Sequence, residues 1–171
     1  MSYQTVHLSG EYQKQLFSCG NEKLDTYLHK QAGQEVKKNY AAAFILPGND
    51  PVKGLIIKGY YTLSGTGVPK DQAPEEIAGK IPYRIIPSIL IGRLAVDQNF
   101  QRQGLGELLL SDALARIYDL SKTLGLFVVC VDPIDERAVI FYSKFGFILR
   151  PENGQMFLPM SVVQKMITGQ R

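Results

Sequence analysis

The sequence predicts a mixed α+β domain in which a central twisted sheet of about six to seven strands is flanked by about four helices. The front half holds β-prone runs separated by turn residues, which indicates antiparallel strands. The back half alternates strand, helix, strand and helix, which is typical of strands joined by crossover connections. The chain has 171 residues, of which 45% are hydrophobic, so we expect residues 1–171 to form a single domain with one buried core.

Composition and charge limit the classes of function. Charged residues make up 20% of the chain and the formal net charge is +3, which permits an anionic partner without requiring one. The chain lacks an apolar run of about 18 residues, and its N-terminus lacks the pattern of a signal peptide, so we expect a cytoplasmic protein that does not enter a membrane. Cys19 and Cys130 fit neither a disulfide framework nor a zinc pattern, and we expect no metal.

The front half opens with a weakly alternating segment and continues with an apolar pattern at helical spacing, which Asn21 is placed to cap. Turn residues between two β-prone runs then predict a hairpin with the linker PGNDPVKG. The expected elements are an opening strand at 3–8, a helix at 21–38, hairpin strands at 41–46 and 55–63, an irregular segment with a short helix at 69–80, and a strand at 85–97.

The back half contains the strongest helical pattern of the chain, in which leucine, alanine and isoleucine recur at helical spacing until Gly125. The run LFVVCV is almost entirely apolar, as expected for a strand that is buried on both faces. Asp135 is placed to cap a short helix. The expected elements are a helix at 104–124, a strand at 126–131, a helix at 135–144, and last strands at 147–150 and 155–160.

The most informative segment is LAVD at 94–97, followed by QRQGLG at 101–106 and then the long helix. Such a turn presents several backbone N–H groups beside the positive end of a helix, which is suited to phosphate. Gly104 and Gly106 leave room for a pyrophosphate, and Arg102 adds charge. A plain tight turn is the alternative. The segment is no P-loop, because GK[ST] is missing, and no dinucleotide fingerprint, because Leu109 stands at the third glycine position.

This arrangement, RLAVD followed by QxxGxG, resembles the acetyl-CoA motif of the GNAT superfamily of N-acetyltransferases, and FYSKFGF at 141–147 is similar to a second motif of that family. The resemblance extends from about residue 16 to residue 160. It implies a GNAT fold with acetyl-CoA as the acetyl donor, wedged between two splayed central strands, and a backbone N–H of Val96 that polarises the thioester carbonyl. The cofactor-binding residues implied are Leu94, Ala95, Val96, Gln101, Arg102, Gln103, Gly104, Leu105, Gly106, Ala138, Phe141 and Lys144.

Tyr142 stands at the family's position for the acid that protonates the departing CoA thiolate. A thiol has an ordinary pKa of about 8.5 and a phenol of about 10, so this proton transfer is slightly uphill and feasible. Packing among the neighbouring phenylalanines is the alternative role. The sequence reveals no general base. An α-amine, with a pKa of about 7.7–8.0, needs less help to lose its proton than a lysine, which favours an α-amine acceptor.

The front half is similar to a narrower group. FSCGNEKLDTYL at 17–28 and GYYTLS at 59–64 look like segments of the GNAT toxins of bacterial toxin–antitoxin pairs. This resemblance implies a toxin that acetylates the α-amine of aminoacyl-tRNA and blocks translation, a ribbon–helix–helix antitoxin, and a homodimer. Two other hypotheses remain open: a GNAT enzyme for a small-molecule or protein amine, and a non-catalytic module that binds CoA or a partner.

Basic and aromatic residues supply candidate contacts to tRNA. Lys23, Lys30 and Lys37 are spaced by seven, which places them on one face of an α-helix, where they are suited to RNA phosphates or form an ordinary solvated face. Tyr60 and Tyr61 point to opposite faces of a strand, so one of them is a candidate for the acceptor pocket, with core packing as the alternative. The candidate substrate residues are Tyr60, Tyr61, Lys30, Lys37 and Arg93.

Overall fold

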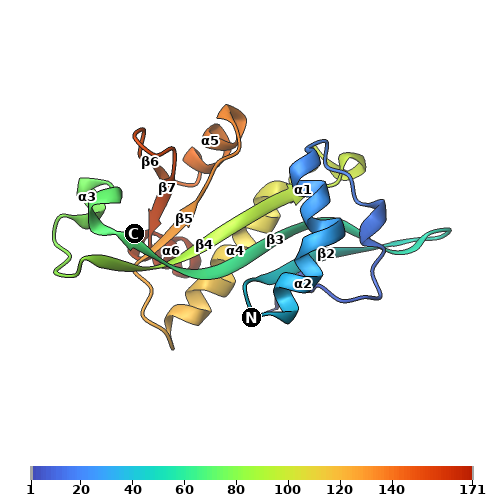
Figure 1. Cartoon of the computed structure of the whole chain (residues 1–171), viewed down its shortest axis with the longest axis horizontal. Coiled ribbons are helices and arrows are strands. Elements are labelled where there is room, and N and C mark those ends of the chain that lie inside the picture. The colour runs from blue at the N-terminus through green and yellow to red at the C-terminus, as the bar shows by residue number, and fades with distance from the viewer. Residues whose placement is uncertain (1, 171) are drawn as a thin grey trace. The chain divides into compact units, whose positions relative to one another are not determined.

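The computed structural model describes residues 2–170 and confirms the mixed α+β architecture (Figure 1). Seven strands of the described chain form one sheet in the order β1-β2-β3-β4-β5-β7-β6, with β4 and β5 parallel. In chain order the elements are β1 (Val6–His7), η1 (Lys14–Leu16), α1 (Glu22–Thr26), the π-helical turn η2 (Tyr27–Gln31), α2 (Ala32–Lys37), β2 (Ala42–Asp50), β3 (Gly54–Pro69), η3 (Lys70–Gln72), α3 (Glu75–Ala78), β4 (Ile85–Val96), η4 (Gln98–Phe100), α4 (Leu105–Ser121), β5 (Val128–Val131), α5 (Glu136–Ser143), β6 (Ile148–Leu149), β7 (Met156–Pro159) and α6 (Met160–Thr168).

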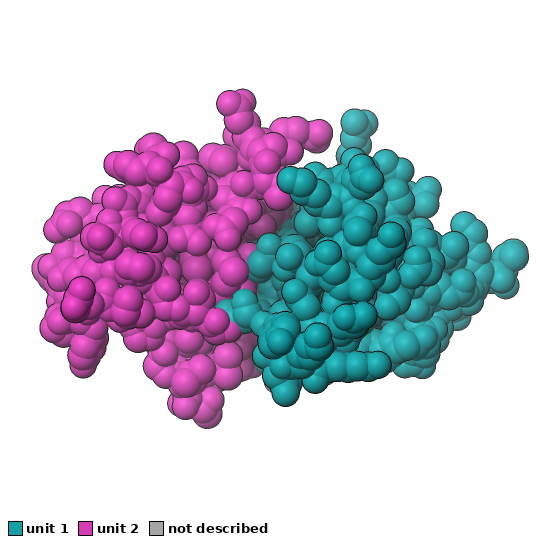
Figure 2. All heavy atoms as spheres, viewed as in Figure 1, with its two compact units in different colours: residues 1–64, 92–114 teal, residues 65–91, 115–171 magenta. Residues whose placement is uncertain are grey.

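The chain divides into two compact units (Figure 2). Unit 1 consists of residues 1–64 and 92–114, and unit 2 consists of residues 65–91 and 115–171. The elements β3, β4 and α4 each contribute residues to both units. The expectation that residues 1–171 form a single domain therefore stays a prediction.

In unit 1 helices cover both faces of the β2–β3 hairpin (Figure 1). Tyr60 points to the helical segment 22–37 and donates a hydrogen bond to Leu24 O at 2.7 Å, whereas Tyr61 points to α4 and donates to Asp112 Oδ2 at 2.7 Å. A Cβ at Gly59 would lie 2.8 Å from the Leu109 side chain, so glycine lets α4 pack directly on the strand.

The helix predicted at 21–38 forms, but it is not a continuous α-helix. Asn21 caps it as predicted, since its side chain accepts a hydrogen bond from Leu24 N at 3.2 Å. The π turn η2 then separates α1 from α2. This segment packs Tyr27, Leu28 and Ala32 against hairpin residues in a core cluster, whose buried members are Phe17, Tyr27, Leu28, Ala32, Ile45, Ile57, Tyr60 and Ala95.

A β-bulge interrupts the hairpin at Lys58. Leu46 pairs with Gly59 and Pro47 pairs with Ile57, so the register passes over Lys58. The extra residue reverses the alternation of side chains along β3, and Ile57 therefore joins Tyr60 in the same core cluster. The bulge is relevant to the candidate site because Lys58 O accepts a hydrogen bond from Asp97 N at 2.8 Å.

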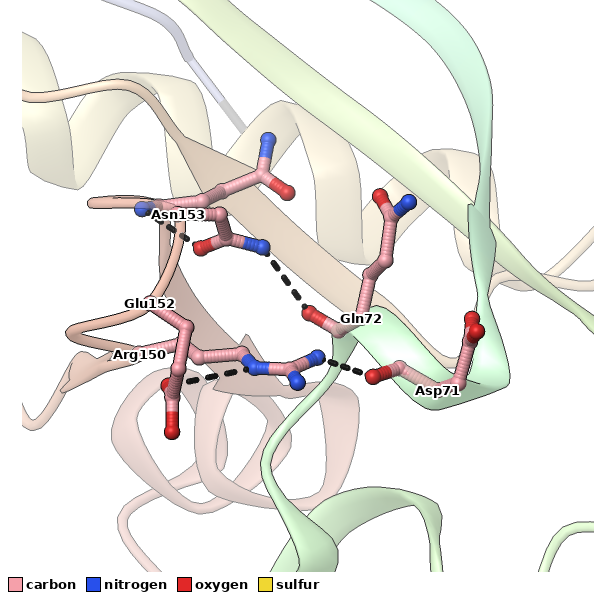
Figure 3. A network of polar contacts seen from close by, with 6 residues as sticks. Asp71, Gln72, Arg150, Glu152 and Asn153 are labelled. Atoms are coloured by element: carbon pink, nitrogen blue, oxygen red, sulfur yellow. Dashed lines mark hydrogen bonds and ion pairs between the residues drawn. The ribbon is translucent and has the colours of Figure 1, made fainter.

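In unit 2 the strand β5 is buried along its whole length, as predicted, but it begins at Val128, and Phe127, which was expected in the same buried strand, lies outside it and is 42% exposed. It pairs with β4 on one side and with β7 on the other. The loop between β6 and β7 holds the segment that follows β3 (Figure 3): the Arg150 guanidinium donates to Asp71 O, and Asn153 Nδ2 donates to Gln72 O at 3.2 Å. These bonds connect two loops of unit 2 that lie about half the chain apart in sequence.

Several boundaries differ from the predictions. The hairpin strands continue into the predicted linker, because Asp50 Oδ1 accepts bonds from Val52 N and Lys53 N, both at 2.8 Å, and closes a shorter turn. The helix α4 ends at Ser121, and Leu124 is 54% exposed instead of buried. The helix α6 was not predicted, and its first residue, Met160, was expected to end the last strand; Gly169, with φ of 67°, ends this helix. None of the helices within residues 2–170 has the length and apolar character that a membrane span requires.

Candidate active site

The strand β4 ends at the predicted donor segment Leu94–Val96. Ala95 is 6% exposed and packs into the core of unit 1, whereas Leu94 and Val96 are half-buried. This alternation anchors one face of the strand end in the core of unit 1 and leaves the side chains of the other face partly exposed. The carbonyl of Val96 accepts a hydrogen bond from Gln101 Nε2 at 2.9 Å, which folds the following turn back onto the strand.

The turn between β4 and α4 has the properties expected of a phosphate-binding loop. Residues 101–104 are all exposed. Arg102 and Gly104 adopt positive φ angles of 64° and 78°, and a Cβ at Gly104 would meet no heavy atom within 4 Å. The turn leads directly into α4, a helix of 17 residues, whose N-terminal dipole favours an anion. The geometry is therefore suited to the pyrophosphate that the sequence predicts at this position.

Two polar side chains support this turn, and sequence reasoning assigned neither of them that role. Asp97, which is 4% exposed, accepts hydrogen bonds from Ser18 N at 3.0 Å and from Asn99 N at 2.9 Å. Gln101 donates to Cys19 O and to Val96 O, both at 2.9 Å, so its amide group binds protein backbone. Aspartate often accepts a hydrogen bond from the backbone two residues later, so the bond from Asn99 N could have been predicted from the sequence. The bond from Ser18 N, 79 positions away, could not.

Tyr142 lies near the end of α5, where it is 7% exposed. Its ring packs against Phe141 at 5.2 Å and Phe147 at 5.3 Å between centroids. Burial raises the pKa of the Tyr142 phenol well above its ordinary value. The group is therefore protonated at neutral pH, which is the state that a general acid requires.

The other predicted cofactor residues of α5 occupy different environments. The backbone N–H of Ala138 is taken up by the predicted cap, since it donates to Asp135 Oδ1 at 2.8 Å. Phe141 is half-buried, and Lys144 is exposed at the end of the helix. Gly146 follows with φ of 93°, which lets the chain turn from α5 into β6. Lys144 therefore places a positive charge in solvent at the end of α5.

The predicted lysine face is wrong in its geometry. Lys23, Lys30 and Lys37 are exposed, but the π turn η2 lies between the first and the last of them. A π turn holds one residue more than an α turn, which rotates the following residues by about 100°. Lys23 and Lys37 therefore point to different sides of the helical segment. A contact of Lys30 or Lys37 with tRNA stays a prediction.

The remaining candidate substrate residues are more enclosed. Tyr60 and Tyr61 are both fully buried, and their hydroxyl groups are bonded to Leu24 O and to Asp112 respectively. These contacts correspond to the core-packing alternative, and a role of either ring in substrate binding stays a prediction. Arg93 is half-buried, with its guanidinium over the ring of Tyr27.

The thiol and imidazole groups supply no evident nucleophile or base. Burial raises the pKa of Cys130 to about 12, and burial together with a hydrogen bond involving Asp25 raises the pKa of Cys19 to about 12. Both cysteines are therefore thiols at neutral pH and poor nucleophiles. His29 Nε2 lies 2.7 Å from Phe17 O, so the imidazole is hydrogen-bonded to the backbone of the loop before α1. The candidate groups are thus the exposed turn at residues 101–104 in unit 1 and Tyr142 in unit 2.

Comparison with known proteins places this chain in a family. The model of the acetyltransferase (GNAT) domain matches residues 68–149. The tRNA-acetylating toxin of Mycobacterium tuberculosis is 33% identical to this chain over 135 residues, which represent 79% of the chain and 78% of the toxin. Both matches are to acetyltransferases, and the second extends over most of each protein.

Solved structures are similar over nearly the whole chain. The structure of AtaT complexed with acetyl-methionyl-tRNAfMet has a TM-score of 0.85 and 29% identity, and the alignment covers 97% of this chain and 99% of that one. A tyrosine-to-phenylalanine mutant of the AtaT toxin, bound to acetyl-CoA and the C-terminus of the antitoxin AtaR, has a TM-score of 0.81 and 27% identity, with 96% and 97% covered. Given the glycine turn suited to phosphate, the buried tyrosine and these relatives, the chain belongs to the GNAT acetyltransferase family.

Proposed function

We propose that this protein is an acetyl-CoA-dependent N-acetyltransferase that acetylates the α-amino group of aminoacyl-tRNA and thereby blocks translation as a toxin. The observation that carries the proposal is the match to a tRNA-acetylating toxin over 79% of this chain. A site suited to the phosphates of CoA supports it, because residues 101–104 are exposed in front of the α4 N-terminus.

The donor is bound through its phosphates and its pantetheine arm. The backbone N–H groups of residues 101–106 bind the pyrophosphate, and Arg102 adds a charge-assisted contact. The pantetheine arm lies along Leu94–Val96, as the family resemblance implies. A backbone N–H at this strand end, that of Val96, polarises the thioester carbonyl as the amine attacks it.

Tyr142 acts as the general acid. The amine nitrogen forms a bond to the carbonyl carbon, the C–S bond breaks, and its electron pair stays on sulfur. Tyr142 donates its proton to this thiolate, the amine releases a proton to solvent, and the resulting tyrosinate takes a proton back from solvent, so that the products are an amide and CoA and the phenol is restored. Burial raises the pKa of the phenol, which opposes the transfer. Desolvation raises the pKa of a thiol for the same reason, so a thiolate that leaves in apolar surroundings is also a stronger base.

The α-amine of an aminoacyl ester is a suitable acceptor because it needs little basic assistance. An α-amine has a pKa of about 7.7–8.0, so a substantial fraction is neutral at cellular pH. This property fits a site in which neither a histidine nor a cysteine is placed as a base. Exposed Lys30 and Lys37 and half-buried Arg93 supply positive charge for the RNA backbone.

The same proposal includes the partners. A ribbon–helix–helix antitoxin binds and inhibits the enzyme, and the enzyme forms a homodimer and acts in the cytoplasm. The relative AtaT bound to the C-terminus of its antitoxin AtaR supports the first point. Co-expression with a gene product encoded beside this one, followed by purification of the complex and its mass, tests both the partner and the dimer.

The activity is tested by incubating the purified protein with labelled acetyl-CoA and aminoacylated tRNA, with deacylated tRNA as the control. We expect label on charged tRNA alone, released with the amino acid on mild alkaline hydrolysis. Label that remains on the tRNA after hydrolysis would place the acetyl group on the nucleic acid and contradict the proposal. Binding of CoA without any transfer to charged tRNA would direct the search to small-molecule or protein amines.

A further inference from the structure

The FSCG segment at residues 17–20 is hydrogen-bonded to the residues that lead into the phosphate-binding turn of unit 1, although the two are about 80 residues apart in sequence. Three hydrogen bonds connect them. Ser18 N donates to Asp97 Oδ2 at 3.0 Å, Gln98 N donates to Ser18 O at 2.8 Å, and Gln101 Nε2 donates to Cys19 O at 2.9 Å. The segment therefore offers both backbone donors and acceptors to the residues that precede the turn.

Asp97 is the centre of this arrangement. Its side chain is 4% exposed, and its two oxygens accept from two different segments, Oδ2 from Ser18 N and Oδ1 from Asn99 N. Its own backbone N–H donates to Lys58 O at the β-bulge, at 2.8 Å. One residue thus joins the end of β4, the start of η4, the hairpin bulge and the FSCG segment.

Gln101 supplies the second connection. Its Nε2 group uses both hydrogens, one for Val96 O and one for Cys19 O, each at 2.9 Å. An amide nitrogen engaged in this way is not free to donate to a phosphate. The side chain instead connects the first residue of the turn to the strand before it and to the FSCG segment.

The FSCG segment is itself fixed by local contacts. Cys19 N donates to Asp25 Oδ1 at 2.8 Å, and Phe17 is 2% exposed in the core of unit 1. Gly20 has φ of 93°, and a Cβ there would lie 3.0 Å from the Gln98 side chain, so glycine permits the close approach of the two segments. The segment that contacts Asp97 and Gln101 is therefore itself anchored in unit 1.

We propose that Asp97 and Gln101 are positioning residues that hold the phosphate-binding turn against the FSCG segment, which makes this N-terminal segment a structural part of the donor site. The inference rests on the proposed use of acetyl-CoA. The turn itself is exposed, so its conformation before the donor binds depends on these bonds. A turn that is already ordered loses less conformational entropy when it binds the pyrophosphate.

Two variants test the inference. Asp97→Asn replaces one acceptor oxygen by a donor group, so that either Ser18 N or Asn99 N loses its acceptor. Gln101→Met removes both donated bonds from an exposed side chain of similar length, and it provides the test even where Asp97→Asn fails to fold. The control is Asp50→Asn, which makes the same chemical change at the hairpin turn of unit 1; both backbone N–H bonds there go to Oδ1, an oxygen that asparagine keeps.

The first measurement is calorimetric titration of each protein with CoA in the absence of an acceptor. We expect both test variants to bind CoA about tenfold more weakly than the wild type, and Asp50→Asn to bind it equally well. Wild-type protein that fails to bind CoA would contradict the proposed function. Wild-type binding that both test variants retain in full would overturn the positioning role and leave the proposed function standing.

The second measurement separates positioning of the turn from general damage. The transfer reaction is compared for acetyl-CoA and for S-acetyl-pantetheine, which lacks the pyrophosphate. We expect the variants to lose kcat/KM with acetyl-CoA through a higher KM, and to use S-acetyl-pantetheine as well as the wild type does. An equal loss with both donors would assign the two residues a purely structural role and overturn the inference.

Discussion

The guanidinium of Arg93 lies over the face of Tyr27, with its carbon Cζ 3.5 Å from the ring centroid. Tyr27 is held in turn by its hydroxyl, which donates to the Glu35 carboxylate, and by the stacked ring of Tyr60 at 6.4 Å. Arg93 directly precedes the donor segment of β4. The contact therefore connects the last residues before the donor segment to the π turn of the N-terminal helical segment.

A double-mutant cycle measures this contact. Arg93→Ala and Tyr27→Leu should show a coupling free energy of about 0.5–2 kcal/mol in urea unfolding, because the ring face attracts the guanidinium. Tyr27→Phe is the control, since it keeps the ring and should keep most of the coupling to Arg93. Additive effects of Arg93→Ala and Tyr27→Leu would show that the two groups lie together without stabilising each other.

Tyr142→Phe should lower kcat by at least about 100-fold and leave the dissociation constant of acetyl-CoA unchanged. The ring contacts with Phe141 and Phe147 remain in this variant, so its thermal stability should stay close to that of the wild type. Tyr118→Phe on α4 is the matched control and should retain full activity. A Tyr142→Phe enzyme with wild-type kcat would rule out the phenol as the acid.

Gly104→Ala and Gly154→Ala form a matched pair. Both glycines have positive φ angles, 78° and 71°, and a Cβ at either would meet no heavy atom within 4 Å. Each substitution should therefore destabilise the fold by a similar amount, about 1 kcal/mol, through backbone strain alone. Gly104→Ala alone should also weaken CoA binding in calorimetry, because its methyl group lies in the phosphate-binding turn. Equal CoA binding by the two variants would argue against a phosphate at Gly104.

Stability should fall at alkaline pH because of Cys130. Burial raises the folded-state pKa of this thiol to about 12, whereas an unfolded thiol titrates near about 8.5. Below about pH 8.5 the thiol is protonated in both states; above it, the unfolded state loses the proton first, and the free energy of unfolding decreases with rising pH. Urea unfolding at several values between about pH 7.5 and 9.5 should show this slope, and Cys130→Val should reduce it. An unchanged slope in that variant would assign it to other groups.

Elements with strong local signals were predicted from the sequence. Asn21 and Asp135 cap helices where the sequence placed them, since a cap depends on bonds to residues three positions away. The buried strand β5 and the glycine turn before α4 were predicted for the same reason. In each of these cases the signal lies in a few adjacent residues.

Tertiary contacts decided the features that local patterns do not contain. The π turn changed the directions of Lys23 and Lys37, and the bulge at Lys58 reversed the faces of β3. The bonds from Asp97 to Ser18 and from Gln101 to Cys19 join residues 79 and 82 positions apart, so no local spacing encodes them. The sequence by itself determined the family, the main elements and the glycine turn before α4, because these depend on motifs of neighbouring residues. Only the folded chain determined what supports that turn, because a buried polar group takes its partners from whichever segment packs against it.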